Sequence, residues 1–526
     1  MLAQIASFVD LFVWLLVLKS FFLPLFIIPT GSMAETLAGA HATHTCPNCG
    51  WEHMIGPERF VDRLGRQRDD LPPVIQCPNC RFQQHTAAQQ PGGVALQLKA
   101  GDRIVVLGWP YDIGGDLGPR RWDVVVFKNP NAPDVNYIKR LIGLPGETIE
   151  IVDGDVFVKG PHDDDFYCAR KTPHAQRALW FPYYDHDYPP RQPARDWMTG
   201  AARWPDYFPH WALRSGESGW QGLDTRTPRF DGADAGRGVI QFATRQGENP
   251  PPGEVLDIYG YNARRADYNY VTDVRLCTDV RIEAGSGYVE LCISKHDDFF
   301  YARLHADGTL TLEHESRSDG LRQEWGRTHL SLPDRPVRFA LGHADYHVAV
   351  QVDDRTVLES SPAQYRGTRA LARQRSGQRA APVIRIAAER VRASFAHLRI
   401  DRDVYYVSGR LRGNSAEYAN GTEGHPLTLN DQAYFVCGDN SPNSLDSRAW
   451  TAETLGPHLR AAYERGQYAI GTVPASQMIG RAFLVYWPGF MPLSETGLGL
   501  APRGGPLAWL RSLNILPDLG RVRWIH

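Results

Sequence analysis

Alternation of apolar and polar residues constrains the fold of this chain more than any other feature. Five segments between residues 271 and 401 alternate in this way, with turn sequences such as Ala-Asp-Gly and His-Ala-Asp within them: 271–284, 287–295, 299–316, 337–354 and 383–401. Successive side chains of a strand point to opposite faces, so alternation predicts strands with one buried face. Several short strands joined by turns predict an antiparallel β-sandwich, which we place at residues 236–404.

An apolar run lies near the N-terminus. Between residues 5 and 28 the apolar residues are interrupted only by Ser7, Asp10, Lys19, Ser20 and Pro24. About 20 apolar residues span a bilayer as a helix. A cleaved signal peptide would begin with basic residues and end at a small-x-small site, but the first eight residues hold no Lys or Arg and the run ends in Ile-Ile-Pro. An uncleaved transmembrane anchor at 5–28 is therefore favoured.

Composition restricts the classes of function. The chain has 526 residues, which is enough for several domains, and a hydrophobic fraction of 43% is typical of globular protein. The formal net charge is only -2. Because nucleic-acid-binding domains carry a large basic excess, we expect no nucleic acid partner.

Three separated stretches carry residues suited to catalysis: PTGSM at 29–33, NYIKRLIGLPGETIEI at 136–151 and FVCGDNSPNSLDSR at 435–448. In this order they resemble the motif boxes of bacterial type I signal peptidases, the membrane-anchored serine proteases that remove signal peptides from exported proteins. Strand-like runs at 121–128 and 479–488 stand where that family has further core strands. The resemblance covers roughly residues 5–40, 96–160 and 404–490.

The chemistry of Ser32 and Lys139 can be considered separately. A serine hydroxyl needs an adjacent base, and Ser32 is not part of a Gly-x-Ser-x-Gly elbow. A lysine serves as the base when desolvation lowers its pKa toward neutrality. Alternation points Lys139 to the same face as Tyr137 and Leu141. The resemblance implies that Ser32 is the nucleophile and Lys139 the general base, beside the membrane surface; without it, Ser32 would be a helix cap and Lys139 a solvated lysine.

The resemblance assigns the remaining roles residue by residue. The backbone N–H of Ser32 and the hydroxyl of Thr30 correspond to the oxyanion hole. Ser444 stands at the position that orients the base lysine. Asp446 and Arg448 correspond to a structural ion pair behind the site.

The turn between Cys437 and Ser444 departs from regular structure. Gly438, Asp439 and Asn440 tolerate left-handed backbone angles, so we expect them to form the turn that brings Ser444 to the lysine. One position departs from the family pattern, because Glu35 stands where relatives commonly carry Pro.

Two Cys-x-x-Cys pairs lie between residues 41 and 95. Cys46, Cys49, Cys77 and Cys80 resemble the two knuckles of a zinc ribbon, and four thiolates satisfy tetrahedral zinc. The 27 residues between the pairs exceed the usual 15–20. An oxidising compartment would favour two disulfides instead, and a redox role is a third alternative. Structural zinc is favoured, and no catalytic cofactor is expected.

The resemblance and the composition shifts together predict the organisation of the chain. It comprises a transmembrane anchor at 5–28, a catalytic core at 29–40, 96–160 and 405–490, a zinc-ribbon-like insert at 41–95, an irregular connection at 161–235, the β-sandwich at 236–404 and a tail at 491–526. The fold class is mainly β. The sandwich broadly resembles concanavalin-type jelly rolls, which often bind carbohydrate, although a scaffold role is favoured.

Two functions from different classes follow. The first is signal peptidase I, which cleaves preproteins at small-x-small sites from a single-pass position in the inner or plasma membrane, in contact with lipid, with its catalytic domain outside the cytoplasm. The second is a membrane-tethered binding or scaffold protein whose protease core is vestigial and whose sandwich binds carbohydrate or protein. A Ser-Lys protease that cleaves one dedicated partner is a narrower version of the first. The presence of Ser32, Lys139 and Ser444 together favours the first.

Overall fold

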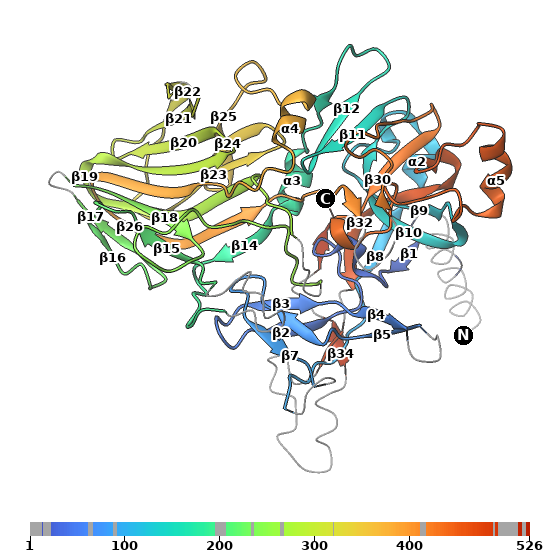
Figure 1. Ribbon diagram of the computed structural model, residues 1–526, viewed down its shortest axis with the longest axis horizontal. Helices are drawn as coiled ribbons and strands as arrows, with labels where there is room; N and C mark the ends of the chain where they lie inside the picture. The colour runs from blue at the N-terminus through green and yellow to red at the C-terminus, as the bar shows by residue number, and fades with distance from the viewer. Residues whose placement is uncertain are drawn as a thin grey trace, which may run out of the picture.

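The computed structural model describes residue 13 and residues 23–61, 67–87, 92–194, 207–232, 236–262, 268–318, 320–410, 417–487, 490–492, 514–517 and 522–525. Strands dominate these residues, so the predicted mainly β fold is confirmed (Figure 1). The helices of the described part are short. They are α2 (Trp109–Ile113), α3 (Pro173–Leu179), α4 (Arg369–Arg375) and α5 (Pro457–Glu464), with 3-10 turns η2 (Gly31–Met33), η3 (Gly115–Leu117), η4 (Ser441–Asn443) and η5 (Ala475–Gln477).

An eight-stranded antiparallel sheet positions the candidate site. Its order is β1-β8-β32-β9-β10-β30-β31, with β35 beside β32. The strands are β1 (Leu25–Ile27), β8 (Arg103–Leu107), β9 (Val124–Asn129), β10 (Ala132–Gly143), β30 (Ala433–Cys437), β31 (Val473–Pro474), β32 (Met478–Trp487) and β35 (Arg523–Trp524). Segments from opposite ends of the chain thus lie side by side in one sheet, as the blue and orange-red strands of Figure 1 show.

The central strand β9 explains why this sheet has apolar runs rather than alternation. Val124 and Val126 pack in one apolar cluster, whereas Val125 and Phe127 pack in another. Both faces of the sheet are therefore covered, and a strand buried on both faces is apolar throughout.

A four-stranded sheet adjoins this core. It has the order β13-β12-β11-β29, formed by β11 (Thr148–Val152), β12 (Asp155–Lys159), β13 (Tyr167–Cys168) and β29 (Leu427–Thr428). Ile149, Ile151 and Val156 pack there with Phe435 of β30, so one apolar cluster joins the two sheets.

The sandwich strands form a branched sheet of thirteen strands. Nine of them are β18 (Arg237–Ala243), β19 (Val274–Lys295), β20 (Asp298–His305), β21 (Thr309–Ser316), β22 (Arg322–His329), β23 (Val337–Ala344), β24 (His347–Val352), β25 (Arg355–Glu359) and β26 (Ile384–Arg402). The two longest strands, β19 and β26, pair with each other along most of their length. Residues 275–280 of β19 pair with β23, and residues 288–295 pair with β20. Register shifts between Ile282 and Tyr288 separate the two halves, and in each half β19 lies between β26 and a second strand, β23 or β20.

The connection at 161–235 is more ordered than expected. Besides α3 it holds β14 (Phe181–Asp185), β15 (His210–Leu213), β16 (Trp220–Gln221) and β17 (Arg229–Asp231), all within the thirteen-stranded sheet. The expectation of an irregular connection is wrong there because strands of two to five residues are too short to display a period of two. Residues 195–206 and 233–235 lie outside the described part.

The cysteine insert consists of three short hairpins. They pair β2 (Ala42–Thr45) with β3 (Glu52–Ile55), β4 (Glu58–Val61) with β5 (Gln67–Asp70), and β6 (Val74–Gln76) with β7 (Gln83–His85). Two further two-stranded sheets lie outside the insert. They pair β27 (Gly409–Arg410) with β28 (Glu417–Tyr418), and β33 (Phe490–Pro492) with β34 (Asn514–Pro517).

The predicted membrane anchor at 5–28 lies largely outside the described residues, since 1–12 and 14–22 are not among them. Its last part is not helical: Leu25–Ile27 form β1 and pair with Arg103–Val105 of β8. Pro24 also disfavours helical backbone angles at Leu23, the residue before it. Among the helices that the structure describes, none is both long and apolar enough to cross a bilayer.

Candidate active site

Ser32 lies on η2, immediately after the edge strand β1. The loop that carries it is fixed by burial: Met33 and Leu37 are fully buried and pack with Ile28 and Val106 of the eight-stranded sheet. The backbone N–H of Ala38 also donates to a carboxylate oxygen of Asp102 at 2.9 Å. Ser32 is only 9% exposed, so its hydroxyl is held within the protein rather than on a free surface.

Lys139 meets Ser32 from the inner strand β10. Its Nζ lies 2.7 Å from Ser32 Oγ, across 107 residues of sequence, and also donates to the Ile138 carbonyl at 3.0 Å. The ammonium lies 5.0 Å from the centroid of the Tyr137 ring, on the face that alternation predicts. Lys139 is 4% exposed.

The electrostatics of Lys139 suit a base. Burial, which removes water from the ammonium, lowers the pKa of Lys139 to about 8, although the carboxylates of Asp446 and Asp439 act in the opposite direction. A neutral amine has a lone pair that can accept the proton of the Ser32 hydroxyl. The arrangement can therefore perform nucleophilic catalysis without histidine.

The turn after β30 closes over Ser32, and Gly438 makes the approach possible. A Cβ atom on Gly438 would lie 2.3 Å from Ser444 Oγ and 2.4 Å from the Ser32 carbonyl oxygen. Ser444 is fully buried at this contact. The expectation of left-handed angles is wrong, because Gly438, Asp439 and Asn440 have no positive φ. Crowding, not backbone conformation, requires glycine here.

Asp439 has a role that its sequence position did not indicate. Its two carboxylate oxygens accept hydrogen bonds from Nε and Nη2 of Arg140, both at 2.7 Å, and both side chains are fully buried. The third guanidinium nitrogen of Arg140 donates to the Trp122 carbonyl at 2.7 Å. A buried arginine between apolar residues requires a carboxylate, and the apolar run around Arg140 was the signal that could have found this pair.

Asp446 and Arg448 form a second fully buried pair. Arg448 Nε and Nη2 donate to the two oxygens of Asp446 at 2.9 and 2.7 Å. Arg448 also donates to the Val407 carbonyl and to Ser441 Oγ, each at 2.8 Å. The backbone N–H of Gly438 donates to Asp446 at 2.9 Å. The pair thereby connects the turn to Val407, which follows β26 in the chain.

Asn440 contacts the backbone on both sides of the candidate nucleophile. Its side-chain amide donates to the Gly31 carbonyl at 2.9 Å, and its backbone N–H donates to the Ser32 carbonyl at 3.1 Å. Thr30 precedes η2 in an extended conformation and is exposed. The structure thus brings the turn residues and Ser32 together, with Thr30 at the solvent side.

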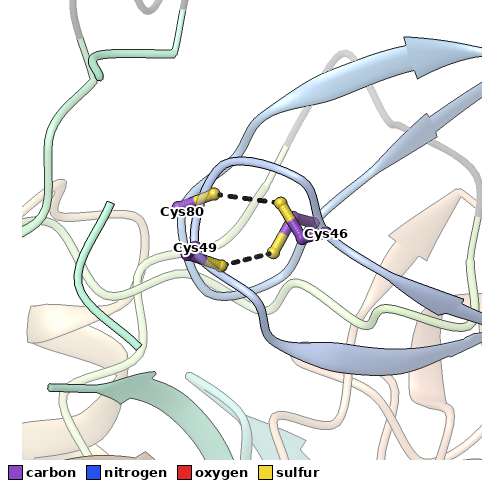
Figure 2. Close-up of side chains that lie close together, drawn as sticks. Cys46, Cys49 and Cys80 are labelled. Atoms are coloured by element: carbon purple, nitrogen blue, oxygen red, sulfur yellow. Dashed lines mark hydrogen bonds between the residues drawn. The ribbon is translucent and has the colours of Figure 1, made fainter. Parts of the chain in front are cut away.

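The four cysteines of the insert converge. Cys46 Sγ lies 3.6 Å from Cys80 Sγ, and Cys49 Sγ lies 3.7 Å from Cys77 Sγ; Figure 2 shows the thiols facing one another. All four sulfur atoms lie within 4.8 Å of each other, and none forms a disulfide. Thiolates that bind one tetrahedral zinc at about 2.3 Å lie about 3.8 Å apart. The donor set and its spacing therefore fit a zinc ion.

Comparison with known families identifies relatives of the core. The family model described as "Signal peptidase, peptidase S26" matches residues 82–194 and 352–487. Signal peptidase I of Pseudomonas aeruginosa is 41% identical over 69 residues, 11% of this chain and 24% of that protein. Signal peptidase I of Pseudomonas fluorescens is 38% identical over 81 residues, which are 13% of this chain and 28% of that protein. That of Rickettsia akari is 52% identical over 40 residues, 8% and 15%.

Solved structures were also compared with the chain, and each of the following two matches part of it. The carbohydrate binding module CBM66 from Bacillus subtilis covers 36% of this chain and 95% of its own, with 11% identity and a TM-score of 0.23. A Bacillus licheniformis beta-glucanase covers 40% and 96%, with 8% identity and a TM-score of 0.24. At these TM-scores the likeness carries no conclusion about the sandwich.

The chain spans between 15% and 28% of the length of these three curated relatives. The family model covers Lys139 and the turn at 435–448, and both of these lie against Ser32 in the structure. Residues 82–194 and 352–487, slightly less than half of the chain, are therefore similar to the signal peptidase family, peptidase S26.

Proposed function

We propose that this protein is a signal peptidase I, a serine endopeptidase that removes signal peptides through a Ser-Lys dyad. One observation carries the proposal: a buried lysine with a lowered pKa lies 2.7 Å from the hydroxyl of a buried serine. The similarity of residues 82–194 and 352–487 to the signal peptidase family supports the reaction class.

The proposed reaction has two stages. Neutral Lys139 accepts the proton of Ser32 as Oγ bonds to the carbonyl carbon of the scissile peptide, and the Ser32 N–H and the Thr30 hydroxyl donate to the resulting oxyanion. The Lys139 ammonium then gives its proton to the leaving amine, which leaves an ester on Ser32. Lys139 next deprotonates a water molecule that hydrolyses this ester, and the proton returns to Ser32. In this proposal Ser444 orients the lysine.

The substrates, location and organisation follow from the same proposal. Preproteins with small-x-small cleavage sites bind to the core formed by 29–40, 96–160 and 405–490. The apolar run at 5–28 anchors the chain once in the inner or plasma membrane, in contact with lipid, with the core outside the cytoplasm. The similarity to the signal peptidase family and the length of the apolar run support this assignment.

Cleavage of a detergent-solubilised preprotein with an Ala-x-Ala site tests the function. We expect the wild-type protein to release the signal peptide and Ser32→Ala to release none, because in this proposal the ester forms on Ser32 Oγ. Product masses from mass spectrometry locate the cut bond. Failure of the folded wild type to cut several such preproteins would contradict the proposal and favour the membrane-tethered binding protein.

We also propose structural zinc at Cys46, Cys49, Cys77 and Cys80, which the sulfur distances support. Native mass spectrometry is expected to find one zinc ion per wild-type chain and none in Cys77→Ser, and Cys77→Ser is expected to unfold at a lower temperature. Cys292→Ser, which changes a buried cysteine outside the cluster, is the matched control and should retain the ion. Two disulfides in place of zinc would leave only four of the eight cysteines reactive toward a thiol reagent after denaturation.

A further inference from the structure

A segment of the sandwich insert, residues 257–262, lies against the loop of Ser32. It falls outside both parts of the family match, which end at 194 and resume at 352. Tyr259 donates its hydroxyl to the Asp439 carbonyl at 2.9 Å. The backbone N–H of Gly260 donates to Glu35 at 3.3 Å, and the Tyr261 hydroxyl donates to the Ala40 carbonyl at 2.6 Å. A segment outside the family match thus contacts both the nucleophile loop and the turn that covers it.

The contact is closest at Gly31. A Cβ atom on Gly31 would lie 1.8 Å from the ring of Tyr261, so the ring rests directly on the residue before the nucleophile. Glu35, which stands where relatives commonly carry Pro, supplies the carboxylate that accepts from Gly260. The one departure from the family pattern near Ser32 therefore faces the 257–262 segment.

Asn262 forms a reciprocal amide pair with Asn440. Asn262 Nδ2 donates to Asn440 Oδ1 at 2.7 Å, and Asn440 Nδ2 donates to Asn262 Oδ1 at 2.7 Å. Two hydrogen bonds in opposite directions fix the plane of the Asn440 amide, and the Gly31 carbonyl, which can only accept, determines which end of that amide carries the nitrogen. The second hydrogen of Asn440 Nδ2 is thereby directed at the Gly31 carbonyl, 2.9 Å away.

The Gly31 carbonyl and the Ser32 N–H belong to one peptide unit. In a planar trans peptide the C=O and the N–H point in opposite directions, so holding the oxygen fixes the direction of the N–H. The proposed reaction uses that N–H to stabilise the oxyanion, and donors aligned before the reaction contribute most.

We propose that Asn262 is a positioning residue of the peptidase: through Asn440 it orients the Gly31–Ser32 peptide so that the Ser32 N–H points at the oxyanion. This inference rests on the proposed peptidase function. It assigns to the sandwich insert a part in catalysis, in addition to any ligand that the insert binds.

Kinetics of Asn262→Ala on a preprotein substrate test the inference. We expect kcat to fall about tenfold with KM within about twofold, because the oxyanion exists only in the transition state. Inhibition by a peptide aldehyde, whose adduct with serine places an oxygen at the oxyanion position, should weaken about tenfold as well. The pH at which kcat/KM declines should not move, since Asn262 acts on the peptide of Ser32 and not on the lysine.

Two further variants separate positioning from folding. Asn262→Asp keeps the size of the side chain but replaces the donor to Asn440 by an oxygen. It should therefore also lower kcat and weaken inhibition by the peptide aldehyde. Tyr270→Phe removes a hydrogen bond to Glu254 at 2.7 Å in the same loop region and should leave both quantities unchanged. An unchanged kcat in both Asn262 variants, or a change in KM alone, would overturn the inference. If the wild type itself cleaves nothing, the proposed function fails instead.

Discussion

Lys139→Met is expected to lower kcat on a preprotein by about 10²- to 10⁴-fold, the range that loss of a positioned general base produces. Methionine fills the buried site without a lone pair that can take the Ser32 proton from 2.7 Å. Lys159→Met, in β12 of the neighbouring sheet, serves as the control and should keep kcat within about twofold. A loss below tenfold in Lys139→Met would assign the base to another group.

The same lysine sets the pH dependence of the wild type. Only the neutral amine accepts a proton, so kcat/KM should fall about tenfold per pH unit below about pH 8, where the pKa of Lys139 lies, and level off above it. Folding lowers this pKa from its ordinary value of 10.5, so the unfolded chain binds more protons between these two pH values. The contribution of Lys139 to stability therefore rises with pH across that window.

Unfolding by denaturant at several pH values checks this linkage. Below about pH 8 the folded protein contains a buried ammonium. The free energy of unfolding of Lys139→Met should therefore exceed that of the wild type by the largest amount in this pH range. The difference between their free energies of unfolding should shrink by up to about 3 kcal/mol as pH rises to 10.5. A difference independent of pH would show that the pKa is not lowered by folding.

Local patterns predicted the parts of the fold that depend on local chemistry. Alternation indicated the sandwich strands because one face of each is buried, and the order of the motif boxes indicated Ser32 and Lys139, which the structure places 2.7 Å apart. Short strands such as β14 and β16 were not predicted, because they are stabilised by pairing with other strands, β26 and β17 respectively.

Contacts between distant segments could not be predicted. The sequence shows that Arg140 is surrounded by apolar residues, but its partner Asp439, 299 residues away, depends on β10 pairing with β30 so that Arg140 lies opposite Cys437. The 257–262 segment carries no periodic pattern. Its role depends on the surface against which it packs. In the sequence, the indication of this contact was Glu35, which stands where the family pattern has Pro and which accepts a hydrogen bond from Gly260 of the segment.

Asp446→Asn is expected to lower the free energy of unfolding by about 3–5 kcal/mol, because it leaves the guanidinium of Arg448 buried without a countercharge. The matched control is Asp334→Asn. Asp334 lies 2.7 Å from Arg281, the same distance as in the buried pair, but its side chain is 94% exposed, and the loss of such a surface pair costs about 0–1 kcal/mol. Equal destabilisation by the two variants would contradict the importance of burial.

The variant also tests the electrostatics of the site. The Asp446 carboxylate raises the pKa of Lys139 against the larger effect of burial, so removing its charge should lower that pKa further. The decline of kcat/KM in Asp446→Asn should therefore begin at a lower pH than in the wild type, although the protein is less stable. A purely structural ion pair would leave this pH unchanged, whereas a shift to higher pH would mean that Asp446 does not act on Lys139 through its charge.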